Sequence, residues 1–124
     1  MKKVIFICIL MLLTACSSNS EKERDIIQQI EQDLSSIVNS NIVNKTSSNP
    51  NDYITANLED FNNIVSGKQI ALNHFLDKFK EGKENGLKEY IMAAACVEIL
   101  GDKNPVKEWS SGLEWYKKYT AKNE

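Results

Sequence analysis

The chain has 124 residues, of which 42% are hydrophobic and 26% charged, a composition typical of one soluble globular domain. Its formal net charge is −2, with 15 Lys and Arg against 17 Asp and Glu. A nucleic-acid-binding domain would carry a basic cluster, and none stands out along the sequence, so we expect no nucleic-acid partner. The acidic balance is also a poor electrostatic match for anionic lipids.

The first sixteen residues predict where the protein is located. Lys2 and Lys3 precede an apolar run over residues 4–13, which is too short for a transmembrane helix and has the length of a signal-peptide core. Residues 13–16, LTAC, resemble the lipobox of bacterial lipoproteins. The resemblance implies cleavage of a signal peptide, residues 1–15, and attachment of a diacylglyceryl group, such as one carrying palmitate, to Cys16. The alternative is an ordinary secretory signal that happens to end in a cysteine.

The lipoprotein hypothesis predicts an extracytoplasmic protein held at the cell membrane by the lipid on Cys16, since two acyl chains give stable anchoring. Cys8 would leave with the leader, so Cys96 would be the only other cysteine of the mature chain. Cys96 lies in an apolar segment, which favours a small buried hydrophobic residue over a reactive thiol.

Beyond the leader, composition divides the chain into four parts. Residues 16–20 form the lipidated cysteine and a polar tether, and residues 21–38 show helical apolar periodicity, which predicts a membrane-proximal helix with Glu31 and Asp33 off its apolar face. Residues 39–51 are rich in Asn and Ser, which predicts a linker loop. We expect this linker to separate the first helix from a compact helical domain, residues 52–124.

Within residues 52–124 the pattern is helical throughout, so the predicted fold class is all-α, a small helical bundle. Residues 86–101, GLKEYIMAAACVEILG, are apolar around most of the helix circumference, which predicts a buried central helix. Residues 68–80 are amphipathic and should pack on it. The expected N-caps are Asn49, Asn57, Asn85 and Ser111, and Asn104-Pro105 has the look of a further helix start.

The helices over residues 58–80 and 86–100 resemble a HEAT-type helical hairpin, although so few helices cannot form a solenoid. Residues 51–54, 61–72, 86–93 and 109–116 together resemble segments of small lipoproteins from low-GC Gram-positive bacteria. This resemblance covers about residues 51–119. It implies a location and a fold, and it brings no catalytic residues with it.

The sequence offers no recognisable catalytic, metal or cofactor site. His74 is the only histidine and is expected to be solvated, and zinc-type sites need several His or Cys ligands. Glu89 and Glu98 stand among apolar neighbours in the central helix. They would be the carboxylates of the alternative function, a small cell-envelope hydrolase.

Four aromatic residues of the C-terminal region are the candidate partner-binding set: Trp109, Trp115, Tyr116 and Tyr119. Trp and Tyr are frequent anchors at interfaces, but a small domain also uses terminal aromatics to close its core. The leading hypothesis is a non-catalytic protein- or peptide-interaction module at the membrane. An immunity lipoprotein that neutralises a secreted toxin is a special case of it.

Overall fold

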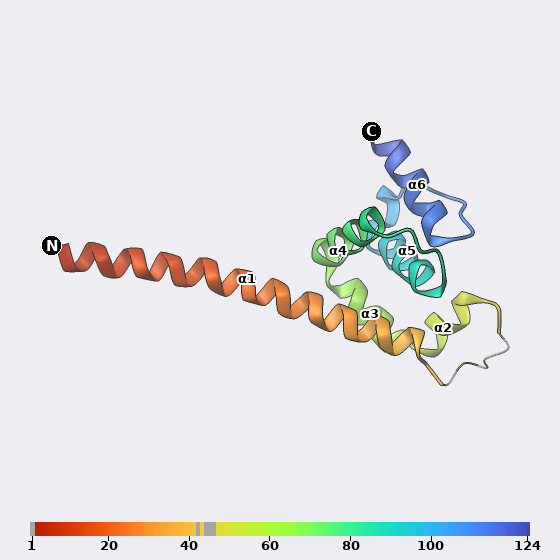
Figure 1. Ribbon diagram of the computed structural model, residues 1–124, viewed down its shortest axis with the longest axis horizontal. Helices are drawn as coiled ribbons and strands as arrows, with labels where there is room; N and C mark the ends of the chain where they lie inside the picture. Colours follow the sequence, from red (N-terminus) through yellow and green to blue (C-terminus); the bar gives the residue numbers. More distant parts are fainter. Residues whose placement is uncertain (1, 42, 44–46) are drawn as a thin grey trace.

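The computed structural model describes the backbone of residues 2–41, 43 and 47–124, and the side chains of these residues from Asn19 onward. The described residues form α-helices and a short 3-10 helix and contain no strand, which confirms the all-α prediction (Figure 1). The elements are α1 (Lys2–Val38), α2 (Pro50–Ala56), α3 (Leu58–Ser66), α4 (Lys68–Glu81), α5 (Leu87–Leu100), η1 (Gly101–Lys103) and α6 (Gly112–Asn123).

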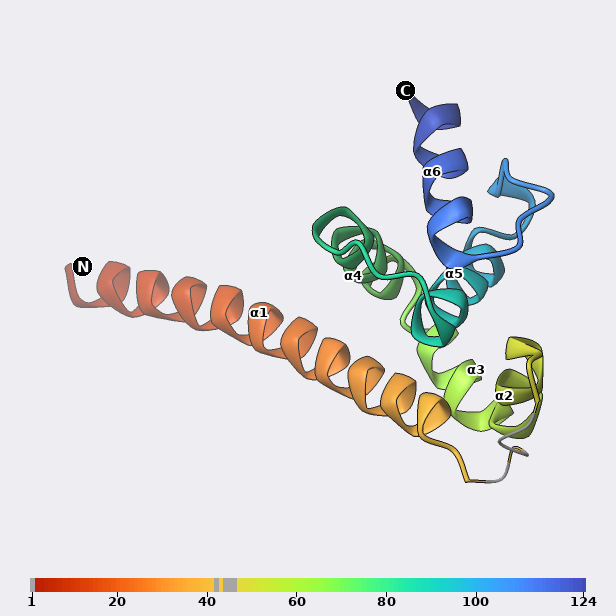
Figure 2. The ribbon, with the colours of Figure 1, turned by 45° about the vertical axis from the view of Figure 1, so that its right-hand side comes forward.

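The first half of α1 projects from the body of the molecule as a straight helix in both ribbon views (Figures 1 and 2). The expected tether, residues 16–20, is part of this helix, because the backbone is helical without interruption from Lys2 to Val38. The side chain of Cys16 lies outside the described residues. In the part of the chain that the structure describes, no helix is both long enough and apolar enough to cross a membrane.

The second half of α1 belongs to the core. Ile30, Leu34 and Ile37 are at most 2% exposed and pack in one cluster with the apolar residues of α3, α4 and α5. The core therefore crosses the boundary expected at residues 39–51, because the apolar stripe of this helix needs a partner surface and finds it on α3. Of that expected linker, residues 50 and 51 are the start of α2, and residues 42 and 44–46 lie outside the described residues.

Helix α5 lies at the centre of the domain and packs against α4 and α6, as Figure 2 shows. The core predicted around it is confirmed in its main part, since Leu72, Phe75, Ile91 and Ala95 are at most 5% exposed. Leu76, Ala94 and Ile99 are only half-buried against the same cluster. The amphipathic α4 and the apolar α5 thus form the expected helical hairpin.

Two of the expected N-caps are confirmed. The Asn49 side chain accepts a hydrogen bond from the Asn51 N–H, with Pro50 in the first helical position. The Ser111 hydroxyl accepts from the Glu114 N–H at 3.2 Å. Glu114 does not return the bond to the cap residue itself; its carboxylate accepts from Ser110 instead.

The other two expected caps provide no side-chain cap. Asn57 stands at the N-cap position of α3, as predicted, but its side chain donates to the Tyr53 carbonyl instead of capping that helix. Asn85 does not cap α5, which begins after Gly86; its Oδ1 accepts from the Leu113 N–H, in the first turn of α6. A polar side chain next to one helix can satisfy the free N–H groups of another when tertiary packing brings the two ends together.

Asn104-Pro105 starts no helix, because residues 104–109 run as an irregular loop. Asn104 is buried, and its side chain bonds the Val106 backbone at both of its polar atoms. Its Oδ1 also accepts from the Trp115 indole N–H at 3.3 Å. Asn104 therefore folds the loop onto α6 rather than opening a helix.

Candidate binding site

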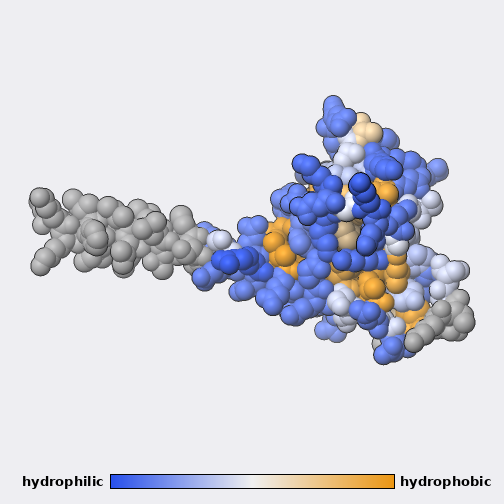
Figure 3. Space-filling view, viewed as in Figure 1, coloured by the Kyte–Doolittle hydropathy of each residue, from blue (hydrophilic) through white to orange (hydrophobic). Residues whose placement is uncertain are grey.

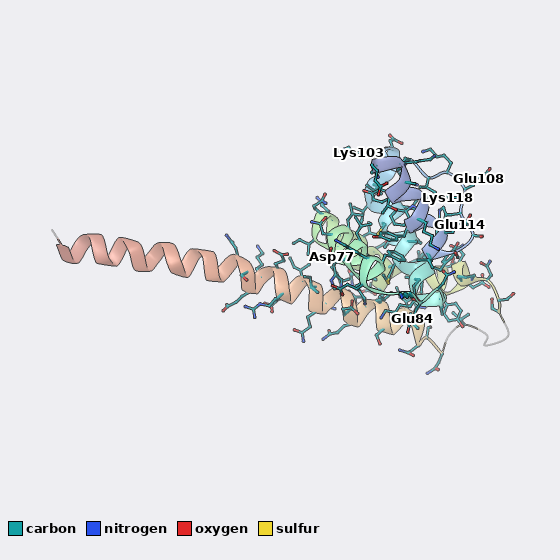
Figure 4. The ribbon with its side chains drawn as sticks, turned by 45° about the horizontal axis from the view of Figure 1, so that its top comes forward. Asp77, Glu84, Lys103, Glu108, Glu114 and Lys118 are labelled. Atoms are coloured by element: carbon teal, nitrogen blue, oxygen red, sulfur yellow. The ribbon has the colours of Figure 1, made fainter. Side chains whose placement is uncertain are left out.

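The side chains around the turn between α4 and α5 enclose a hollow of about 240 Å³, here called the α4–α5 pocket. Both helices and the turn contribute to it: it is lined by Lys78, Phe79, Gly82, Lys83, Glu84, Lys88, Glu89 and Met92. Figure 4 labels Glu84 on this turn, well separated from Glu108 and Lys118 near α6. On the face shown in Figure 3, hydrophilic residues cover most of the domain and leave smaller hydrophobic areas between them.

The floor of the α4–α5 pocket is apolar and fixed in place. Phe79 and Met92 are 4% and 2% exposed. The Phe79 ring stacks on Tyr116 with centroids 5.2 Å apart and meets Trp115 at 6.1 Å. Aromatic neighbours on two sides restrict the ring, so the floor is a preformed apolar surface.

The rim of the pocket carries charges of both signs. Lys78, Lys83 and Lys88 contribute ammonium groups, and Glu84 and Glu89 contribute carboxylates. Burial and the neighbouring charge of Lys88 lower the pKa of Lys78, and its bond to Glu31 opposes that shift. Lys88 also lines a second hollow, on the α1 side, together with Glu31 and Leu34.

A three-residue contact ties this rim to α1. The Glu31 Oε1 atom accepts hydrogen bonds from the Lys78 ammonium and from the His74 Nε2, each at 2.6 Å. His74 is therefore not the solvated residue expected from the sequence, because the docking of α1 brings Glu31 against it. Burial alone would raise the pKa of Glu31, but the bonds from Lys78 and His74 outweigh burial and hold that pKa below its ordinary value.

The carboxylates of the alternative hydrolase hypothesis do not form a pair. Glu89 is 8% exposed, and its Oε1 accepts from the Gly86 N–H at 3.2 Å, so it caps the start of its own helix. Glycine has no side chain to complete a reciprocal capping box. Glu98 is exposed on the same helix.

The aromatic candidate residues are mostly engaged inside the domain. Trp115 is fully buried and stacks on Tyr119 with centroids 4.9 Å apart. Trp109 packs against Tyr90, also at 4.9 Å, and Tyr116 against Phe79. Trp109, Tyr116 and Tyr119 are half-buried. None of the four lines the α4–α5 pocket, although Tyr116 supports its floor.

Cys96 is fully buried in the core, and burial raises the pKa of its thiol to about 12. A thiol in such a setting is unreactive, in agreement with its interpretation as a small buried hydrophobic residue. Among the described residues no group of three or more His, Cys, Asp or Glu side chains could hold a metal ion.

The lysines of the rim are the functional candidates that sequence reasoning missed. Residues 78–88, KFKEGKENGLK, hold four lysines, but acidic residues between them conceal the cluster in a charge profile. Three of the lysines converge because the turn at residues 82–86 folds the end of α4 back toward the start of α5. A search for charges flanking a predicted helical hairpin would have found them.

No protein-family model matches the sequence, and neither a curated protein nor a solved structure shows significant similarity to it.

Proposed function

We propose that the protein is a membrane-anchored, extracytoplasmic lipoprotein that binds a peptide segment of a protein partner without catalysing a reaction. The observation that carries the proposal is the α4–α5 pocket, with its preformed apolar floor and its rim of mixed charge. This arrangement suits one apolar side chain of a partner flanked by polar or charged residues. Buried anchors surrounded by a polar rim are typical of protein interfaces.

The size of the pocket favours a peptide anchor over a small-molecule substrate. Sites that enclose drug-sized ligands usually measure roughly 300–1,000 Å³. The α4–α5 pocket measures about 240 Å³. Glu89, the buried carboxylate that lines it, is held by the Gly86 N–H, and this bond favours a structural role over acid–base work.

The geometry of α1 supports the anchoring part of the proposal. Among the described side chains of α1, which begin at Asn19, the first that packs on the core is Ile26, ten positions after Cys16. At 1.5 Å per residue, this helical segment would hold the domain about 15 Å from a lipid on Cys16. A tether of this kind confines the domain near membrane partners, so a modest affinity suffices for binding. The lipobox-like residues 13–16 remain the basis for the lipid itself.

Site-specific photo-crosslinking in the bacterial membrane tests the proposal. A photoreactive residue replaces Glu84 on the pocket rim or, as the matched control, Glu108 near α6, which is also exposed (Figure 4). We expect a discrete protein adduct from position 84 alone, and its loss when Lys83→Glu reverses a rim charge. Cys16→Ser should lower the yield of the same adduct by releasing the domain from the membrane.

Equal adducts from both positions, or an adduct unaffected by Lys83→Glu, would contradict the assignment of the pocket. A chain that stays acylated and membrane-held after Cys16→Ser would contradict the anchor. A purified wild-type protein that turns over an envelope substrate, with the turnover lost in Glu89→Gln, would favour the hydrolase alternative. Under the immunity hypothesis, the partner captured by crosslinking would be a secreted toxin.

A further inference from the structure

Asp33 is a buried carboxylate in the contact between α1 and α3. It is 6% exposed, although sequence periodicity places it off the apolar face of its helix. The reason is its position between Ile30 and Ile37, three residues after one and four before the other, which turns it toward the same surface. Its Oδ1 accepts a hydrogen bond from the Gln29 side chain at 3.2 Å, whereas its buried Oδ2 has no hydrogen-bond partner among the described residues.

The surroundings of Asp33 oppose a negative charge. Asp60 and Glu59, both in the first turn of α3, are the charged groups that act on it. Asp60 is itself tied to α1, since its Oδ2 accepts from the Ser36 hydroxyl at 3.0 Å. On the α4 side of α1, His74 and Lys78 are both bound by Glu31. Two positions along a helix lie on nearly opposite sides, so Glu31 holds these two side chains away from Asp33.

A buried carboxylate that lacks both a cation and a second hydrogen-bond partner is far less costly when neutral. Burial first, and then the charges of Asp60 and Glu59, raise the pKa of Asp33 above its ordinary value, while the Gln29 bond opposes the shift. A raised pKa of an acid means that folding favours the protonated form. The neutral Asp33 carboxyl therefore contributes fully to stability below the pKa that it has in the unfolded chain. This contribution is lost as pH rises through the pKa that it has in the folded protein.

We propose that Asp33, buried at the α1–α3 contact with one unpartnered oxygen and facing Asp60 and Glu59, is a proton-dependent latch that holds α1 on α3 in its neutral form and loosens when it ionises. The latch would act at the point where the projecting helix joins the domain. The latch therefore goes beyond the proposed binding function, because it makes the packing of α1 on the rest of the domain depend on the pH of the surroundings.

Melting curves of the full chain in detergent at about pH 4, near the ordinary pKa of an aspartate, and at about pH 8 test the latch. Asp33→Asn removes the charge and keeps the shape, and Asp25→Asn, at an exposed position of the same helix, is the matched control. We expect the rise in pH to lower the melting temperature of the wild type and of Asp25→Asn by about 4 °C more than that of Asp33→Asn. Contributions from the groups that all three chains share cancel in this difference.

An equal pH response in Asp33→Asn and in the wild type would overturn the latch. If Asp33→Asn does not fold, carboxyl-carbon NMR of the wild type still decides: titration of Asp33 above the ordinary value of 3.8 supports the proposal, and titration at or below that value overturns it. The melting curves at about pH 8 are repeated with calcium or magnesium chloride. If either salt stabilises the wild type but not Asp33→Asn, then Asp33 binds a metal ion rather than a proton, and the latch is overturned.

Discussion

The domain is closed by two contacts of opposite chemistry. The contact of α6 with α4 and α5 is built from rings and close backbone approach: the fully buried Trp115 meets Phe79 of α4, and Gly112 lies against the first turn of α5. The contact of α1 with α3 and α4 has an apolar centre as well, but ionisable groups flank it on both sides. Glu31 faces His74 and Lys78 on one side, and Asp33 faces Asp60 and Glu59 on the other.

The two contacts should respond differently to pH and salt. Aromatic and aliphatic packing depends little on pH or salt, whereas part-exposed ion pairs are screened and buried carboxylates titrate. The contact made by α6 should therefore keep the same stability across pH and salt and support the α4–α5 pocket. The α1 contact should be the adjustable one, and it is also the one that joins the domain to its projecting helix.

The largest expected effect comes from the contact made by α6. Trp115→Ala removes a fully buried indole that stacks on Tyr119 and donates to Asn104, so it should lower the free energy of unfolding by about 3–5 kcal/mol. The loss should be the same at about pH 5 and about pH 8, because an indole does not titrate in this range. Denaturant unfolding measures it. A loss that changes by more than about 1 kcal/mol between the two pH values would show that the contact made by α6 does depend on pH.

The second effect tests the close approach of α6 to α5. A Cβ atom at Gly112 would lie 2.2 Å from the Glu89 carbonyl oxygen, so Gly112→Ala must push the two helices apart. We expect a loss of about 1–3 kcal/mol, typical of overpacking, in denaturant unfolding.

Gly86→Ala is the control for this substitution. The nearest atom to a Cβ at Gly86 is the Glu89 Oε1, at 3.9 Å, and the backbone φ of −129° is open to alanine. The effect at Gly86 should be much smaller. Equal losses at the two glycines would mean that the α5–α6 approach is not what Gly112 provides.

The apolar framework could largely be predicted from the sequence, because it follows from local patterns. The helix over residues 87–100, the hairpin partner before it and the Asn49 and Ser111 caps each depend on periodicity or on spacing of a few residues. Local patterns cannot show which distant surface a helix finds. The docking of α1, the Asn85 bond to α6 and the role of Asn104 in the Trp115 contact therefore came from the structure alone.

The candidate site, too, could be predicted from the sequence only in part. That Trp115 belongs to the core was one of two open alternatives for the aromatic set, and composition alone could not decide between them. The pocket rim was missed because Glu81 and Glu84 stand among its lysines along residues 78–88 and mask their charge in the sequence. His74 and Asp33 were misplaced because their surroundings are set by contacts between helices more than twenty residues apart in sequence.

The smallest expected effect concerns the contact of α1 with α4. Glu31→Gln removes the acceptor charge shared by Lys78 and His74, with the glutamate side chain 36% exposed. Because water and salt screen such a pair, we expect a loss of only about 0.5–1 kcal/mol near neutral pH, and less at high salt. The free energy of unfolding at two salt concentrations measures it.

The pH dependence of this variant has the opposite sign to that of Asp33. The pKa of Glu31 is lowered in the folded protein, so its contribution is present above the unfolded value of 4.5 and is lost as pH falls through the folded one. The difference between the wild type and Glu31→Gln should therefore vanish in strong acid, whereas the penalty from ionised Asp33 appears as pH rises. Together they predict that the α1 contact is most stable in mildly acidic solution, between the pKa of Glu31 and that of Asp33. A stability difference for Glu31→Gln that grows on acidification would show that the contact with His74 and Lys78 does not hold α1 in place.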